Sequence, residues 1–577
     1  MIHQRLKDNA NKVVVPELSG RRRFILACFM LAMCGLIWRA VDLQVLNNSF
    51  LQNRGDAVHL SNIKIPAYRG QILDRDGHAL AISAPVSSVW VNPQEFNANG
   101  QGKKLARMLE LGQKALTKKT DKTSGRRFVY LRRHMDPQLA ERIEELGVVG
   151  VYAQKEYRRF YPDGEVAAHV VGFTNVDGEG QEGLELAYES RLQGVSGVEQ
   201  VLRDGKRRMV KHVESVREPV PGKDVKLSID RRLQYLAYRE LKAAVAQQKA
   251  KSGSLVLMNP LTGEILAAAN QPAFNPNERS KLTASRVRNR AFVDVFEPGS
   301  IMKPFTVAAG MMSGLFDTST IIDTTPGYMK VGRSQVRDHR NYGKVDLATL
   351  LLKSSNVGSS KIALGIPPEG MWGLLNRLGF GAKTGIDFPG EAKGKLVGFE
   401  RWRPIERATL SFGYGLSSSV LQVAQAYSVL ANNGVLMPAT LLSDGVSEAE
   451  RVIPVEISKS IRHMLQGVVS KVGTAPRAKI QGYTVAGKTG TVKKAVAGGY
   501  SDDKYLGLFA GMAPAKNPKL VMVVMIDEPS AGDYYGGLVA APTFSRVMAG
   551  ALRLMNVAPD NVEEPVTLVA FNQRGAQ

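Results

Sequence analysis

The sequence predicts an α/β or α+β domain of about 330 residues, preceded by a smaller mixed domain and one apolar helix. Three observations support this prediction. A long apolar run lies near the N-terminus, strand-like runs occur at both ends of the C-terminal part, and helix-like patterns lie between those strands. Strands that are far apart in the sequence and enclose a set of helices indicate one sheet that joins distant segments of the chain.

The composition is that of a folded protein with more than one domain. The chain has 577 residues, about four times a typical domain. Its hydrophobic fraction of 44% and charged fraction of 22% exclude a disordered chain. Two cysteines exclude a disulfide scaffold and a cysteine-rich metal cluster. The net charge of +23 (76 basic minus 53 acidic residues) indicates an anionic partner, and nucleic acid, lipid head groups and cell-wall polymer all qualify.

The apolar run has the length of a short membrane-spanning helix. Residues 24–38 are uncharged, and the stretch continues to Val41 past a single Arg39. Three arginines at positions 21–23 precede it and predict an N-terminus that stays in the cytoplasm. A cleaved signal peptide and a buried core helix are the alternatives, but no small-x-small cleavage site follows. We predict a cytoplasmic tail over residues 1–23, a transmembrane helix over 24–44 and an exported remainder.

Both cysteines, Cys28 and Cys34, fall inside this run. Six residues on one helix span about 9 Å, which is too far for a disulfide bond between them. The exported part is therefore predicted to fold without a disulfide.

Basic doublets and turns near residue 222 divide the exported part. The smaller domain, 45–222, is rich in glycine and charge, with a strand-like run at 88–91 and a helical stretch at 137–146. The larger domain is expected over 223–562. The last residues, 563–577, have the composition of a loose tail.

Four strands and one long helix can be predicted in the larger domain. Residues 254–258 and 265–269 are apolar and flank a turn at 259–263, which predicts two neighbouring strands. Residues 420–432 have a helical pattern. Two further apolar runs, at 505–512 and 520–526, are expected to return to the same sheet.

The segment 482–489 matches the phosphate-binding pattern G-x-x-x-x-G-K-[ST], with Lys488 and Thr489 at its end. Residues 520–526 and the acids after them resemble the corresponding strand of an ATPase, so an ATPase is an alternative. A phosphate loop follows a buried strand and opens a helix. Residues 476–481 are a poor buried strand, and Gly490, Thr491 and Val492 are poor helix formers. An exported domain would also meet little nucleotide.

Lys488 belongs more convincingly to a set of three linked motifs. The first is S-x-x-K at Ser300 and Lys303, the second is S-x-N at Ser354 and Asn356, and the third is Lys488-Thr489-Gly490. Each alone occurs by chance and is explained by a helix cap, a turn or a solvated charge. The three in this order, 54 and then 134 residues apart within one exported domain, are a strongly specific combination.

The first motif can supply a nucleophile and its base. Ser300 is expected near the start of a helix, because Pro304 is tolerated only there. Serine and lysine three positions apart share one helix face. Lys303 can accept the hydroxyl proton only when neutral, so its pKa must fall well below the ordinary value. Burial, the helix N-terminus and a second cation, Lys488, all act in that direction.

The other two motifs can bind substrate and transfer protons. Ser354 is suited to relay a proton to a leaving amine, and Asn356 to hold a substrate amide and the lysine. Lys488 and the residues after it, Thr489, Gly490 and Thr491, would present charge and hydroxyls to a substrate carboxylate. The backbone N–H groups of Ser300 and Thr491 would form the oxyanion hole.

With these motifs the chain resembles the serine penicillin-recognising acyltransferases, and more specifically a division-type class B penicillin-binding protein, the septal peptidoglycan D,D-transpeptidase. The resemblance covers nearly the whole chain. Its further motifs are RGQILDRDG at 69–77, RFYP at 159–162, AHVVGF at 168–173, GEGQEGLE at 178–185, LSID at 227–230, GEILA at 263–267, RNRA at 288–291 and GYG at 413–415.

The resemblance implies a single-pass inner-membrane enzyme with a cytoplasmic N-terminus and a periplasmic catalytic domain. It implies a non-catalytic elongated pedestal over 45–222 and a penicillin-binding/serine β-lactamase-like transpeptidase domain over 223–562, without a transglycosylase domain. The family transfers the acyl group of a D-Ala-D-Ala stem pentapeptide and is acylated by β-lactams. It uses no cofactor, metal or nucleic acid. Its partners are a polytopic membrane glycosyltransferase and other divisome proteins. Three aromatic residues resemble those that wall the active cleft in relatives: Tyr505, Tyr534 and Tyr535.

Three rivals share the motifs or the fold. A β-lactam sensor would stay acylated, a β-lactamase would deacylate rapidly, and a divisome scaffold would have a dead site. The pedestal motifs and the length favour the transpeptidase, because lactamases are usually single domains.

Overall fold

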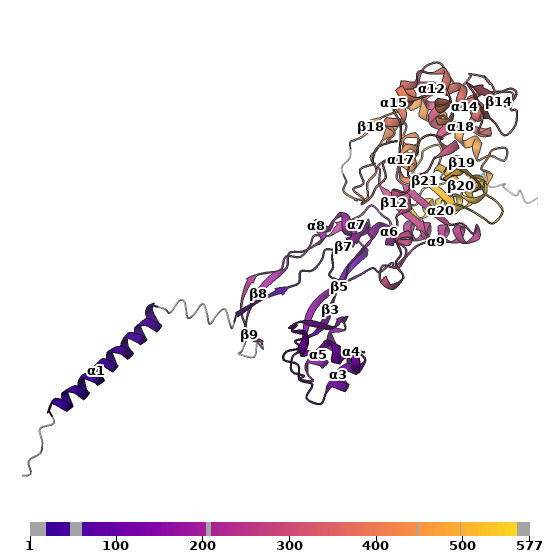
Figure 1. Cartoon of the computed structure of the whole chain (residues 1–577). Coiled ribbons are helices and arrows are strands. Elements are labelled where there is room, and N and C mark those ends of the chain that lie inside the picture. The colour runs from indigo at the N-terminus through magenta and orange to yellow at the C-terminus, as the bar shows by residue number, and fades with distance from the viewer. Residues whose placement is uncertain (1–18, 47–59, 204–208, 446–447, 497, 562–577) are drawn as a thin grey trace, which may run out of the picture. The chain divides into compact units, whose positions relative to one another are not determined.

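The computed structural model describes residues 19–46, 60–203, 209–445, 448–496 and 498–561 (Figure 1). The chain forms two compact units. One comprises Met1–Pro66 with Val195–Val220, and the other comprises Ala67–Gly194 with Pro221–Gln577. Most of the predicted cytoplasmic tail, 1–23, and all of the predicted C-terminal tail, 563–577, lie outside the described residues.

The first unit contains the apolar helix and a small sheet. Helix α1 spans Ser19–Val41 and continues as a π-helix over Asp42–Leu46. Among the described residues, one helix is long and apolar enough to cross a membrane, with a mean hydropathy of 2.1 and none of it buried. Cys28 and Cys34 are both free, as predicted. Strands β1 (Leu60–Ile65), β8 (Gly197–Arg203) and β9 (Met209–Arg217) form an antiparallel sheet in the order β1-β8-β9.

The second unit begins with a five-stranded sheet built around β3 (Ala79–Val91). The order is β10-β2-β3-β4, and β5 also pairs with β3. The other strands are β2 (Ile72–Leu73), β4 (Val129–Met135), β5 (Val151–Phe160) and β10 (Val225–Lys226). The predicted strand at 88–91 is the end of β3.

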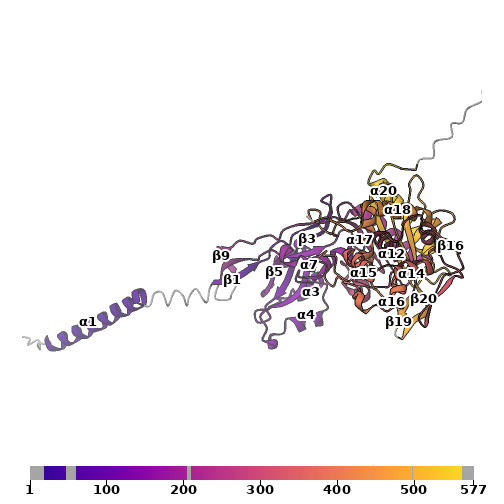
Figure 2. The same cartoon turned by 90° about the horizontal axis from the view of Figure 1, so that it is seen from above.

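Three helices cover one end of this sheet and give it a core of its own. They are α3 (Gly102–Met108), α4 (Gln113–Lys119) and α5 (Pro137–Glu144), which lie beside β3 and β5 (Figures 1 and 2). Asp136 caps α5 by accepting from the backbone N–H of Gln138 and Leu139, and Pro137 follows it. The separate core includes Val89, Val91, Leu105, Leu116, Leu131 and Ile143. We call these helices, with the strand segments that share their core, the head.

Short elements follow the head sheet and surround a buried ion network. Glu185 accepts from Arg69 Nε at 2.8 Å and from Arg159 Nε at 2.6 Å. All three side chains are buried, so this pairing satisfies charges that would otherwise be costly. The elements here are α6 (Ala168–Val171), β6 (Phe173–Thr174), β7 (Gly180–Glu182), α7 (Gly183–Ala187) and α8 (Glu189–Leu192).

The larger part of this unit is built on an antiparallel sheet in the order β12-β11-β21-β20-β19. The strands are β11 (Ser252–Met258), β12 (Ile265–Gln271), β19 (Ala486–Val496), β20 (Gly499–Ala513) and β21 (Leu520–Asp527). All four predicted strands are confirmed, and they join the two ends of the predicted domain in one sheet. Every residue of β11, β12 and β21 is buried.

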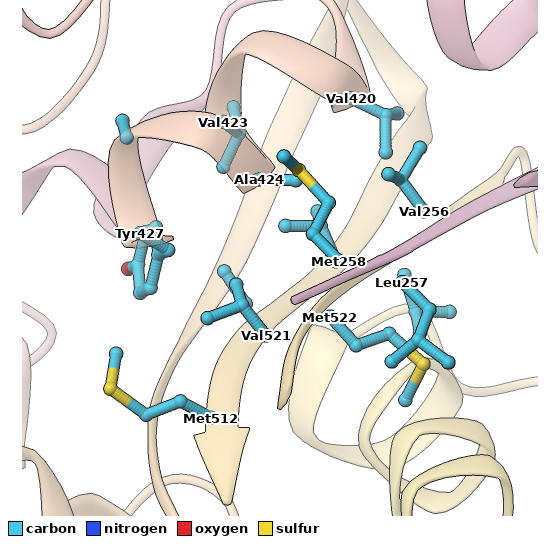
Figure 3. Packing of buried hydrophobic residues seen from close by; sticks show 14 of the residues in the cluster. Val256, Leu257, Met258, Val420, Val423, Ala424, Tyr427, Met512, Val521 and Met522 are labelled. Atoms are coloured by element: carbon cyan, nitrogen blue, oxygen red, sulfur yellow. The ribbon is translucent and has the colours of Figure 1, made fainter. Parts of the chain in front are cut away.

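Helices cover the sheet, and α17 (Val420–Ala431) is buried along its whole length. Figure 3 shows its side chains Val420, Val423, Ala424 and Tyr427 beside Val256, Met258 and Val521 of the sheet. Ser419 and Gln422 cap its N-terminus reciprocally, which fixes where the predicted helix begins. Helices α9 (Arg231–Gln247) and α20 (Ala541–Leu554) pack on each other and on the sheet.

The rest of this part of the chain consists of further helices and short strands. The helices are α10 (Ala284–Val287), α11 (Arg290–Val293), α12 (Lys303–Met312), α13 (Leu347–Lys353), α14 (Asn356–Gly365), α15 (Pro368–Arg377), α16 (Pro404–Leu410), α18 (Val455–Val468) and α19 (Gly536–Val539). The short strands are β13 (Ile322–Asp323), β14 (Tyr328–Val331), β15 (Ser334–Arg337), β16 (Lys344–Val345), β17 (Val435–Leu436) and β18 (Glu450–Arg451).

Candidate active site

Ser300 lies in a 3-10 turn, Gly299–Met302, that leads directly into α12, and Lys303 is the first residue of that helix. The turn is fixed from several sides. The hydroxyl of Tyr427 on the buried helix α17 donates to the carbonyl of Ile301 at 2.8 Å. Gly299 has a φ of +61°, and a Cβ there would lie 2.4 Å from Val492 of β19, so only glycine fits. The core of the sheet thus holds the serine turn against β19.

Lys303 connects the first two motifs. Its Nζ lies 2.8 Å from Ser300 Oγ, 2.9 Å from Ser354 Oγ, 2.7 Å from the Ser354 carbonyl and 2.8 Å from Asn356 Oδ1. The side chain is fully buried. Burial lowers the pKa of Lys303 well below its ordinary value, and the charge of Lys488 lowers it further, whereas Asp338 acts in the opposite direction. Burial and Lys488 therefore both favour the neutral form of Lys303 that a base requires.

The hydrogen-bond partners decide where the lone pair of the neutral amine points. The Ser354 carbonyl and Asn356 Oδ1 can only accept, so they take the two N–H groups of Lys303. The amide of Asn356 is oriented by its Nδ2, which donates to the Arg337 carbonyl at 3.0 Å. The lone pair is then left for a serine hydroxyl, and Ser300 Oγ is the nearer of the two.

Ser354 lies between the two lysines. It ends α13 with a left-handed φ of 59°, which turns its hydroxyl toward both of them. Lys488 Nζ donates to the same hydroxyl, Ser354 Oγ, at 3.0 Å. Burial lowers the pKa of Lys488 to about 7. A proton can therefore pass along Lys303, Ser354 and Lys488 without a large movement.

Lys488 is in the middle of a strand and not at the start of a helix. The segment that matched the phosphate-binding pattern continues as β19 through Thr491, and the side chain of Lys488 is fully buried in the site. A phosphate loop needs a helix at this point. The ATPase alternative is therefore excluded by the local fold.

The residues after Lys488 face other parts of the site. Thr489 Oγ1 lies 2.9 Å from Thr474 Oγ1, and Thr491 Oγ1 accepts from the backbone N–H of Gly536 at 3.1 Å. Gly490 lies so close to the serine turn that a Cβ would meet Ile301 at 3.1 Å and the Pro298 carbonyl at 3.2 Å. The third motif therefore forms a strand edge directly against the first.

The three predicted tyrosines form one stacked row. The ring centroids of Tyr505 and Tyr534 are 4.2 Å apart, and those of Tyr534 and Tyr535 are 4.5 Å apart. The row is joined to the site because Gly536, which follows Tyr535, donates to Thr491. Its role as a wall for substrate stays a prediction.

Asp338 is a site residue that the sequence reasoning missed. Its carboxylate accepts from Ser355 Oγ at 2.6 Å and from the backbone N–H of Asn356 at 2.5 Å and Val357 at 3.0 Å. It thus fixes the S-x-N turn and the start of α14, where a negative charge is favourable. No motif marks it, since it lies in the loop after β15. The sequence indicated only that the first backbone N–H groups of the helix after Ser355 need a hydrogen-bond acceptor, and not which residue supplies it.

Glu297 is a second missed residue. One of its oxygens accepts from the backbone N–H of Gly415 at 2.8 Å, and the other accepts from the hydroxyl of Tyr500 at 2.8 Å. It therefore joins the serine turn, the GYG turn and the β19–β20 hairpin. The one feature of the sequence that could have indicated Glu297 is that it lies three residues before Ser300.

One group of potential metal ligands occurs among the described residues, Asp74, Asp76 and His78. Asp74 Oδ1 accepts from the backbone N–H of Asp76 and of His78, so the group is explained as a turn.

Two family models match this chain. The model of the penicillin binding protein transpeptidase domain matches residues 253–549, and that of the penicillin-binding protein dimerisation domain matches residues 64–227.

Curated relatives match over nearly the full length. A probable peptidoglycan D,D-transpeptidase, PbpC, from Pseudomonas aeruginosa is 43% identical over 95% of this chain and 98% of its own. The peptidoglycan D,D-transpeptidase FtsI of Escherichia coli K12 is 38% identical over 96% of this chain and 95% of its own. A solved structure, the transpeptidase domain of Burkholderia pseudomallei penicillin-binding protein 3, is 40% identical, with a TM-score of 0.54 over 58% of this chain and 98% of that one.

The two domain models together match most of the chain, and relatives 43% and 38% identical cover nearly all of it. The chain belongs to the class B penicillin-binding proteins, the family of peptidoglycan D,D-transpeptidases.

Proposed function

We propose that this transpeptidase cross-links peptidoglycan stem peptides at the division septum through an acyl-enzyme on Ser300. The observation that carries the mechanism is the 2.8 Å contact between Ser300 Oγ and the buried amine of Lys303. Burial and the charge of Lys488 lower the pKa of Lys303 well below its ordinary value, which favours the neutral amine that can take the hydroxyl proton.

Acylation begins when Ser300 Oγ attacks the carbonyl of the penultimate D-alanine and its proton moves to Lys303. The backbone N–H groups of Ser300 and Thr491 stabilise the negative charge on the carbonyl oxygen. Ser354, which both lysines contact, passes a proton to the nitrogen of the leaving D-alanine. The C–N bond breaks, and the stem remains bound to Ser300 as an ester.

The second half of the reaction reverses these proton transfers. The amine of a neighbouring stem attacks the ester carbonyl and loses its proton through Ser354 to Lys303. The new amide is the cross-link, and Ser300 regains its hydroxyl proton.

Substrate recognition is assigned to the strand edge opposite the serine. Lys488, with Thr489, Gly490 and Thr491, would bind the terminal carboxylate of the stem, and Asn356 would hold its amide. The row of Tyr505, Tyr534 and Tyr535 would pack against the stem side chains. A β-lactam would enter the same place and acylate Ser300.

The location of the enzyme follows from α1. We propose a single pass through the inner membrane, with residues 1–23 in the cytoplasm, the helix at 24–44 and both later domains in the periplasm. The basic residues before the helix support this direction. The pedestal is proposed over 45–222, the transpeptidase domain over 223–562 and a loose tail over 563–577. A polytopic glycosyltransferase and other divisome proteins are the proposed partners.

The test is mass spectrometry of the full chain after treatment with penicillin. We expect one adduct per molecule, on the peptide that contains Ser300, which persists for minutes. Ser300→Ala should abolish labelling, and Ser313→Ala, a hydroxyl at the far end of α12, should not. Rapid loss of the adduct would instead indicate a β-lactamase. A lasting adduct in a protein that cannot join stem peptides would indicate a sensor.

A further inference from the structure

The head has a strongly basic surface that the transpeptidase reaction does not use. Residues 100–127 contain nine lysines and arginines and two acidic residues, a net charge of +7. This segment contains α3 and α4, the α-helices that pack on each other and on the head core (Figures 1 and 2). The head core is separate from the core beneath the active site.

Eight of these basic side chains are exposed, and none forms an ion pair with any residue that the structure describes. We call them the basic face; they are Lys103, Lys104, Arg107, Lys114, Lys118, Lys122, Arg126 and Arg127. The ninth, Lys119, instead donates to the carbonyls of Tyr130 and Leu131 and helps to hold α4.

Several of these charges are placed unfavourably for the helices that carry them. Lys103 and Arg107 are four residues apart in α3, and Lys114 and Lys118 are four apart in α4, so each pair repels. Neither helix has an acidic residue in its first turn, and both have a lysine there, against the helix dipole. Arg107 and Lys118 lie in the last turns, where a positive charge is favourable. The lysines of the first turns have no such benefit, which indicates that they serve an external partner.

Other basic residues of the head are paired. Arg132 lies 2.9 Å from Glu110, and Arg133 lies 2.7 Å from Asp177 and 3.2 Å from Glu156. Helix α5 carries two glutamates, Glu141 and Glu144, and one arginine. Acidic residues are thus present in the same small subdomain, and Glu110 and Asp121 even lie between the basic residues in the sequence, but none of the ion pairs that the structure describes joins them to the basic face.

We propose that the basic face is a non-catalytic binding surface for anionic peptidoglycan strands. This inference rests on the proposed function, because such a strand carries a carboxylate-bearing stem at each repeat and the active site holds one stem at a time. Unpaired charges spread over two helices and the following loop suit a polymer with repeated carboxylates. Five of the eight are lysines, whose long flexible side chains can follow a strand that moves.

The apolar side chains of these helices argue against the two other classes of anionic partner. A helix that binds a membrane surface exposes large apolar residues on one side, and a stable protein interface has an apolar centre. In α3 and α4 the apolar residues Leu105, Ala106 and Leu116 are buried in the head core. The large apolar residues that the head does expose, Phe128 and Val149, lie outside both helices.

The test measures co-sedimentation of the detergent-solubilised full chain with purified peptidoglycan sacculi, in saturating penicillin to occupy the active site. The variant replaces Lys103, Lys104, Lys114 and Lys118 with glutamine. The control also replaces four exposed lysines with glutamine, but in the proposed transpeptidase domain, so that the net charge changes equally. They are Lys383, Lys393, Lys479 and Lys516. We expect about tenfold weaker binding for the head variant and no more than about a twofold change for the control.

Two further measurements decide the chemistry. Sacculi whose stem carboxylates have been amidated should bind the wild type as weakly as native sacculi bind the head variant. Vesicles with anionic lipids should bind the head variant and the control equally. Equal binding of both variants to native sacculi, or a vesicle affinity that depends on the head lysines, would overturn the proposal.

The rate of penicillin labelling separates this proposal from the function on which it rests. We expect the head variant to be labelled at the wild-type rate, since the basic face is outside the site. A wild type that sediments through its head lysines but is never labelled would refute the acyl-enzyme and leave the binding surface standing.

Discussion

The Asp338 carboxylate holds the S-x-N turn in place from outside the motif. It accepts three hydrogen bonds there, from Ser355, Asn356 and Val357, and so determines where Asn356 Oδ1 and the Ser354 carbonyl meet Lys303. It also raises the pKa of Lys303, against the effects of burial and Lys488. One side chain therefore affects both the geometry and the proton affinity of the site.

The variant Asp338→Asn should lower the maximal rate of penicillin acylation by about 10- to 100-fold, because an amide cannot accept all three bonds. The pH at which the rate rises should also fall, since loss of the negative charge disfavours protonated Lys303. Stopped-flow labelling over a range of pH measures both effects. Asp323→Asn, an exposed turn aspartate, is the control. A lower acylation rate that still rises at the wild-type pH would show that Asp338 acts only on the geometry of the site.

The two buried lysines predict a bell-shaped dependence of acylation on pH. Lys303 acts as a base when neutral, so the rate should rise as pH increases through its lowered pKa. Lys488 binds a carboxylate when protonated, so the rate should fall above its pKa of about 7. In Lys488→Arg the fall should disappear, because arginine stays charged. A fall that persists unchanged in this variant would assign it to another group.

Glu297 and Tyr500 connect three elements around the nucleophile. Glu297 precedes the serine turn, Tyr500 lies on β20, and Gly415 belongs to the GYG turn. The nucleophile turn, the hairpin and the GYG turn are therefore held as one unit through a single carboxylate.

We expect Glu297→Gln and Tyr500→Phe each to slow acylation by about 3- to 10-fold, because the serine turn loses an anchor to the hairpin. The double variant should be little slower than the slower single variant, since both changes remove the same bond. The penicillin acylation rates of the wild type, the two single variants and the double variant measure the coupling between Glu297 and Tyr500. Tyr328→Phe, an exposed hydroxyl on β14, is the control. Fully additive effects would show that the bond does not connect the two elements.

Elements with a strong local signal could be predicted from the sequence. The apolar runs that became β11, β12, β20 and β21 are buried on both sides, and the run that became α17 is a fully buried helix. Pairings that depend on distant segments could not be predicted. Strands β1 and β8 are more than 130 residues apart in the chain (197 − 65 = 132), and no pattern in either one specifies the other.

The same distinction applies to the site. The three motifs carry their own spacing, and the structure brings Ser300, Lys303, Ser354, Asn356 and Lys488 into one hydrogen-bonded set. Asp338 and Glu297 act through backbone N–H groups of other segments. Those contacts exist only in the folded chain, so residue type and spacing could not reveal them.

At the scale of the whole molecule, the separation of the head core from the main core predicts two unfolding transitions within the second unit. The main core contains the sheet under the active site and also earlier residues such as Ile72, Leu80 and Val170. The head core shares none of these side chains. Segments within one core unfold together, whereas a separate core can open by itself.

Calorimetry of the full chain should therefore resolve a smaller transition for the head and a larger one for the rest of this unit. Leu105→Ala should lower only the smaller transition, and Leu255→Ala only the larger, because each removes a fully buried side chain from one core at a cost of about 2–5 kcal/mol. Acylation by penicillin should raise only the larger transition, because the ligand binds one of the two folded parts. If Leu105→Ala lowered both transitions equally, the head would fold as part of the catalytic unit. The basic face would then be rigidly connected to the active site, and a strand bound on the head would be held at a fixed distance from Ser300.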